Sequence, residues 1–160
     1  WIIWKPTQYQ YWAPENVALV FSRGIEFSLK TIMDFHVTKI IFQSNYNLTR
    51  TTNESKQLTY IPVHTFNMYS GVIYKGYQLY YSLNYTGKRY TQTDNEEENP
   101  ESILDPYFLN DISVSKEFNL ENTAIDLKFA IYNLFDKDYQ VILSRPMPGR
   151  NYSVILTFSF

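Results

Sequence analysis

The stretch that decides the fold is Asn151-Tyr-Ser-Val-Ile-Leu-Thr-Phe-Ser-Phe160, at the end of the chain. Apolar and polar residues alternate along it, with Ile155 as the exception, and its last residue is aromatic. Successive side chains of a strand point to opposite faces, so the segment is predicted to have one oily face and one wet face. Such a strand with an aromatic end is typical of a wall between lipid and water.

The same period of two recurs upstream, and no stretch shows helical periodicity. Together with the last segment, these patterns predict about eight strands, at residues 1–4, 19–31, 35–50, 63–74, 77–86, 108–118, 123–135 and 151–160.

The connections between these strands alternate in length. Those at 33–34, 75–76 and 119–122 are short, and those at 6–18, 51–62, 91–107 and 136–150 are long. In a meander this places every short turn at one end and every long loop at the other, as in outer-membrane barrels. The predicted fold class is therefore all-β, an antiparallel up-and-down transmembrane β-barrel.

Composition sets further limits. The chain has 160 residues, a formal net charge of −2 and no cysteine, so it carries no basic footprint for nucleic acid and no cysteine-based metal site. Aromatic residues make up 18%, a bias that suits membrane interfaces and also a tyrosine-rich soluble sandwich. Polar residues on the inner face, such as Glu26, Lys30 and Lys128, favour a wet or plugged lumen. Eight strands would then be only part of a wall whose open edges need partners.

Two motifs near the end of the chain are distinctive. Asn133-Leu-Phe-Asp-Lys-Asp-Tyr139 is followed by Arg145-Pro-Met-Pro-Gly-Arg-Asn151, and then by the strand ending in Phe160. In this order and spacing they closely resemble the C-terminus of TonB-dependent outer-membrane receptors. Trp12-Ala-Pro-Glu-Asn16 and Ser22-Arg-Gly-Ile-Glu26 also resemble the barrel of that family.

The resemblance implies that residues 1–160 are the C-terminal part of a barrel of about 22 strands. Such a barrel is filled by an N-terminal plug, lies in the bacterial outer membrane and imports a scarce nutrient, such as a metal chelate or a corrinoid. The implied partners are the remainder of the barrel and its plug, the TonB complex through the missing N-terminal part, outer-membrane lipid and the barrel-assembly machinery. It implies a transporter rather than an enzyme, with no resident cofactor or metal.

The motif residues have structural explanations of their own. Asn133 and Asp136 flank Leu134 and Phe135, and short polar side chains of this kind cap turns. Gly149, which precedes Arg150, is expected to supply a positive φ where the loop re-enters the sheet. The resemblance implies that Phe160 is the aromatic residue recognised by the assembly machinery.

The aromatic segment with Tyr9, Tyr11 and Trp12 is the candidate ligand contact, because these rings could stack on a planar or hydrophobic nutrient. An interfacial aromatic girdle would need the same residues in nearly the same place. His36 and His64 are far apart in the sequence, and no nucleophile–base pair is evident.

Two other classes of protein fit parts of the pattern. One is a stand-alone eight-stranded barrel that acts as an adhesin or a structural outer-membrane protein. The other is a soluble β-sandwich binding module.

Overall fold

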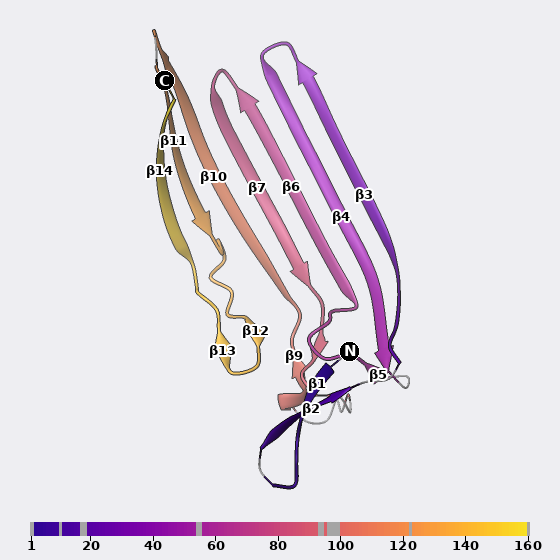
Figure 1. Ribbon diagram of the computed structural model, residues 1–160. Coiled ribbons are helices and arrows are strands. Elements are labelled where there is room, and N and C mark those ends of the chain that lie inside the picture. Colours follow the sequence, from indigo (N-terminus) through magenta and orange to yellow (C-terminus); the bar gives the residue numbers. More distant parts are fainter. Residues whose placement is uncertain are drawn as a thin grey trace.

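The computed structural model describes residues 2–9, 11–16, 19–53, 56–92, 95, 100–121 and 123–159. Its main element is one antiparallel sheet of seven long strands and the short β5 (Lys56–Gln57), which pairs with β4. The long strands, in spatial order, are β14 (Asn151–Ser159), β11 (Thr123–Tyr132), β10 (Tyr107–Leu120), β7 (Tyr77–Thr86), β6 (His64–Tyr74), β4 (Thr38–Asn53) and β3 (Phe21–Phe35). Figure 1 shows them side by side as a single layer.

Each long strand pairs with the long strand before it in the sequence, so the sheet is an up-and-down meander, as predicted. The three short connections gather at one end of the sheet and the long ones at the other (Figure 1). The β6–β7 turn is at Lys75–Gly76 as expected, with both residues at positive φ. The β3–β4 turn lies at His36 and Val37, three residues beyond the predicted position, because β3 continues through Phe35.

The strand pairing places the predicted apolar positions on one continuous face. One row of directly paired apolar residues crosses all the long strands, namely Met33, Ile40, Val72, Leu79, Val114, Phe129 and Val154. Partners in an antiparallel pair share a face, so the alternation in the sequence has become a two-sided wall.

Aromatic residues border this apolar face at both ends. Phe35, Tyr74, Tyr77, Phe118 and Phe158 lie towards the short turns, and Tyr46, Phe66, Tyr85, Phe108 and Tyr152 lie towards the long loops. Along β7, the eight residue-to-residue steps from Tyr77 to Tyr85 span about 26 Å. With the strand tilt of about 35–45° found in outer-membrane barrels, this corresponds to about 20 Å along the membrane normal, close to their apolar band of about 25 Å.

The opposite face is polar. One paired row on it consists of Ser28, Asn45, Asn67 and Asn84, and the Ser28 hydroxyl donates to Asn45 Oδ1 at 2.7 Å. Gly71 lies on this face by alternation and has no room for a side chain, because the ring of its partner Tyr80 lies where a Cβ atom would be. The ring covers the glycine and stacks on Tyr69, with 5.2 Å between ring centroids.

The N-terminal segment differs from the prediction. Residues 1–4 were expected to form a strand of the wall, but β1 (Ile2–Pro6) instead pairs with β2 (Trp12–Asn16) in a separate two-stranded sheet. This hairpin lies at the long-loop end (Figure 1). The prediction failed because β1 and β2 are close enough in sequence to pair with each other, and alternation does not identify a strand's partner.

The arrangement argues against both alternative classes. Among the described residues no second sheet packs on the main sheet, as a sandwich would require, and β3 and β14 do not pair to close a small barrel. The only helix there is the 3₁₀ turn η1 (Pro100–Ser102), and no described helix is long and apolar enough to cross a membrane. Both outer strands therefore present an unpaired edge, as expected for a segment of a larger wall.

Candidate functional site

Most of the buried residues lie towards the long-loop end, where the connections β7–β10 and β11–β14 meet. Both loops contain short paired segments, β8 (Arg89–Tyr90) with β9 (Ile103–Leu104) and β12 (Gln140–Ile142) with β13 (Arg145–Pro146). β12 and β9 are in contact with each other. This junction of two loops is the candidate site.

Asn133 fixes the start of the second loop. It is 5% exposed and has φ of 51°, a conformation that asparagine tolerates better than most residues. Its Oδ1 accepts from the Lys137 amide at 2.8 Å, and its Nδ2 donates to the carbonyls of Lys137 at 2.9 Å and Pro148 at 3.5 Å. Its own amide donates to Asp111 Oδ1 on β10 at 2.9 Å. The predicted capping role of Asn133 is therefore confirmed.

Asp136 joins the two ends of the same loop. Its Oδ1 accepts from the Arg150 amide at 2.7 Å, just before β14 begins. A Cβ atom on Gly149 would lie 2.8 Å from that oxygen, so glycine is needed there for close approach. The prediction of a positive φ at Gly149 is wrong, because among the described glycines only Gly76 has one. Sequence alone does not distinguish these two reasons for a glycine.

The other motif residues are less enclosed. The Leu134 amide donates to the Asn110 carbonyl at 2.7 Å, whereas Phe135 projects from the turn and is 69% exposed. Phe160 lies outside the described residues.

The side chain of Arg89 links the two loops. It is 3% exposed, and its Nη2 donates to the carbonyl oxygens of Gln140 at 3.1 Å and Asp105 at 3.4 Å. Its guanidinium carbon lies 5.1 Å from the centroid of the Tyr107 ring, within the range of a cation–π interaction. Its Nε has no hydrogen-bond partner. One buried side chain thus holds both loops in place.

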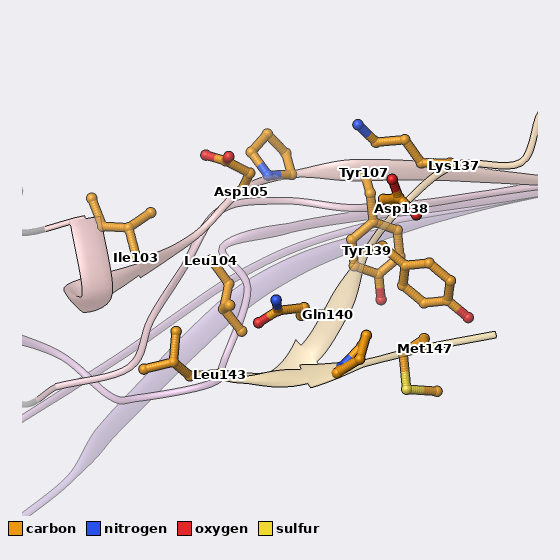
Figure 2. A pocket seen from close by; sticks show the side chains of 12 residues that line it. Ile103, Leu104, Asp105, Tyr107, Lys137, Asp138, Tyr139, Gln140, Leu143 and Met147 are labelled. Carbon is orange, nitrogen blue, oxygen red and sulfur yellow. The ribbon is translucent and has the colours of Figure 1, made fainter. Parts of the chain in front are cut away.

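Beside these contacts the loops line an open hollow of about 500 Å³ (Figure 2). This volume is in the range of small-molecule pockets. Its wall is mixed: the rings of Tyr107 and Tyr139 lie 4.7 Å apart by their centroids, and Lys137, Asp105 and Asp138 add charge. Apolar side chains complete the lining, including Leu104, Leu143 and Met147. Such a wall can stack on a flat group and hydrogen-bond its edges.

Burial raises the pKa of Tyr139 above the ordinary tyrosine value of 10.0, and Tyr107 and then Asp111 add to the rise. The folded loop therefore disfavours the phenolate more than the unfolded chain does. The resulting stabilisation is fully present below pH 10 and is lost as the pH rises through the raised value.

We expect the loop junction to open progressively above pH 10, and Tyr139→Phe to remove this dependence because it keeps the ring and lacks the ionising hydroxyl. A fluorophore on a cysteine introduced at Ser144 of the intact protein would report the opening. An unchanged pH profile in the Phe variant would show that another group controls it.

The aromatic residues predicted as a ligand contact lie elsewhere, on the β1–β2 hairpin. Tyr9, Tyr11 and Trp12 are all exposed, and the rings of Tyr9 and Tyr11 are nearly parallel, with centroids 6.3 Å apart. The Thr7 amide and hydroxyl both donate to the Tyr11 carbonyl, which fixes the hairpin tip. The structure brings Tyr9 and Tyr11 together and places Trp12 on the same hairpin, apart from the Asn133 motif.

Sequence reasoning missed Arg89, Tyr107 and Asp111. Arg89 lies in a loop where a single arginine usually remains in solvent, so no pattern marked it. Asp111 is one of many polar residues on the polar face, so alternation did not single it out, although its carboxylate accepts the hydrogen bond from the Asn133 amide. In the described ranges, no three His, Cys, Asp or Glu side chains come together as a potential metal site.

Comparison with known proteins gives a consistent result. A family model described as TonB dependent receptor-like, beta-barrel matches residues 2–134. No curated protein matches. Among solved structures, the closed form of the ferric-catecholate import receptor Fiu from E. coli K12 is similar, with 19% sequence identity and a TM-score of 0.61. The match covers 97% of this chain and 22% of that one, so this likeness shows the fold and the chain spans a minor part of the receptor's length.

Proposed function

Because the chain belongs to the TonB-dependent receptor-like β-barrel family, we propose that it forms C-terminal wall strands of an outer-membrane importer. One observation carries the proposal. An uninterrupted row of apolar residues crosses the sheet on one face, and a row of polar residues lies on the opposite face. A wall of this kind separates lipid from a wet or plugged lumen. The free edges of β3 and β14 would then pair with the other strands of a barrel of about 22 strands.

The function of the whole receptor would be energy-dependent import of a nutrient, not catalysis. A plug inside the barrel, and the TonB complex acting through it, would couple uptake to energy. The cargo class is a scarce nutrient such as a metal chelate or a corrinoid. Fiu, the structural neighbour, is a ferric-catecholate importer, so a ferric catecholate is a sensible first test substrate.

The long-loop end is the side on which the nutrient would arrive. The hairpin rings of Tyr9, Tyr11 and Trp12 would make the first contact, and the hollow beside Tyr107 would hold a flat group. The Asn133, Asp136 and Gly149 contacts keep the loop around the hollow in place. Phe160 would serve in delivery to the barrel-assembly machinery.

Uptake by cells tests the proposal. Cells that have the intact receptor as their only importer of the kind should accumulate a labelled ferric catecholate, haem or corrinoid. Accumulation should stop when TonB is deleted. Equal accumulation with and without TonB, or none of any substrate, would contradict the proposal.

The same assay tests the hairpin. The combined change of Tyr9, Tyr11 and Trp12 to alanine should lower uptake by about tenfold. For comparison, the stacking of one nucleic-acid base on an aromatic side chain contributes about 1–3 kcal/mol to binding. Phe35→Ala is the matched control, because Phe35 is similarly exposed but lies at the short-turn end. Equal loss in both variants would indicate a folding defect instead of lost contact.

A further inference from the structure

Lys116 is the basic residue that interrupts the apolar face near the short turns. It lies on β10 between Val114 and Phe118, and its cross-strand partners are Tyr77 and Leu127. Its Nζ donates to the Lys75 carbonyl at 2.7 Å and lies 3.9 Å from the centroid of the Tyr77 ring. The ammonium group is therefore held at the β6–β7 turn, on the side of the wall that faces lipid.

A second ammonium group comes from that turn itself. Lys75 is exposed, and its Nζ lies 5.3 Å from the centroid of the Tyr74 ring. Tyr74 and Tyr77 are direct cross-strand partners, so the two lysines and the two phenol rings form one patch. We call these residues the turn patch: Tyr74, Lys75, Tyr77 and Lys116.

The two lysines of the turn patch lack an anionic partner among the described residues. A contrast is given by Lys39, which lies near the same end on the polar face and pairs with Asp34 at 3.7 Å. A cation on a lipid-facing surface is costly unless it reaches the interface or meets a counter-charge. The patch lies at the aromatic border of the apolar face, at the expected level of the lipid headgroups, where an anion would supply the missing counter-charge.

Apolar residues continue directly from the patch into the lipid-facing surface. Val72 and Leu79, which are paired with each other, lie two residues from Tyr74 and Tyr77 and are well exposed. A ligand that places a phosphate at the lysines would thus lay a hydrocarbon chain over these side chains. An anionic phospholipid has both parts, whereas a free phosphate has only the first.

We propose that the turn patch binds the phosphodiester headgroup of an anionic phospholipid in the membrane leaflet at the short-turn end. The ammonium groups of Lys75 and Lys116 supply the charge, and the hydroxyls of Tyr74 and Tyr77 reach the same interfacial level. The inference rests on the proposed outer-membrane location and extends it to a defined lipid contact.

Native mass spectrometry of the intact receptor tests this. The receptor is reconstituted in vesicles that contain phosphatidylcholine and phosphatidylglycerol in equal amounts, and the ratio of the two lipids retained on the released protein is measured. Wild type should retain phosphatidylglycerol preferentially. The preference should fall by about fivefold for each of Lys75→Gln and Lys116→Gln, the effect expected of one basic residue at an anionic surface.

Lys39→Gln is the matched control and should leave the preference unchanged, because that lysine is on the polar face. Raising the salt concentration should weaken the wild-type preference for phosphatidylglycerol. The double variant Lys75→Arg with Lys116→Arg keeps both charges and should preserve that preference. These two results test the inference even if the glutamine variants fold poorly. Equal retention of both lipids by wild type, or an undiminished preference in the double glutamine variant, would overturn the inference. Displacement of the lipid by inorganic phosphate would also overturn it, in favour of a free-phosphate site. Failure of wild type to enter any vesicle would instead contradict the proposed membrane location.

Discussion

Replacing Val154 with arginine should lower the free energy of unfolding of the intact barrel by about 2–4 kcal/mol. Val154 belongs to the apolar row that crosses every long strand, lies near the middle of β14 and is 69% exposed on the face assigned to lipid. The arginine side chain would enter hydrocarbon without a described carboxylate beside it. Denaturant titration of the receptor refolded in vesicles would measure the change.

Thr157→Arg provides the control on the same strand. Thr157 is on the polar face, directly opposite Asp126, whose buried Oδ1 has no hydrogen-bond partner. An arginine there has a carboxylate within reach, so we expect little loss of stability. If the two arginine variants were equally destabilised, the assignment of faces to lipid and lumen would be wrong.

Asn133→Ala should weaken the closed state of the loop from 133 to 150 by about 2–4 kcal/mol. The change removes the hydrogen bonds to the Lys137 amide and carbonyl, each with a net contribution of about 0.5–1.5 kcal/mol. It also places alanine at a φ of 51°, which adds about 1 kcal/mol or more of backbone strain. Hydrogen exchange at the Lys137 amide should therefore become much faster.

Two further variants separate these contributions. Asn133→Gly relieves the backbone strain but not the loss of hydrogen bonds, so it should be milder than alanine. Asn133→Asp keeps the acceptor for the Lys137 amide and should retain most of its protection. Unaltered exchange at Lys137 in the alanine variant would show that the bonds to Asn133 do not hold the loop.

The faces and the meander could be predicted because they depend on local rules. Alternation assigns each side chain of β7 or β14 to a face, and a short connection such as Lys75–Gly76 leaves neighbouring strands little choice but to pair. Strand partners at the N-terminus could not be predicted, since β1 has two candidate neighbours and the same alternation suits both.

The candidate site was only partly predictable for a related reason. Asn133 and Asp136 act on backbone groups of the Asn133–Arg150 segment, so their capping could be inferred from residue type. Arg89 acts on carbonyls of Asp105 and Gln140, which become its neighbours only after two long loops fold together. Lys116 could have been singled out from the sequence, because it is a charged residue at an apolar position of an alternating strand.

The strict pairing of each long strand with its predecessor has a consequence for the path of folding. Each new strand finds its partner edge next to it along the chain, so each step closes only one connecting loop, and the entropy cost grows slowly with the length of that loop. The sheet can therefore grow by successive addition of hairpins, and a growing edge is always available as a template. Until another strand pairs with it, the same edge is open to pairing with any other extended chain.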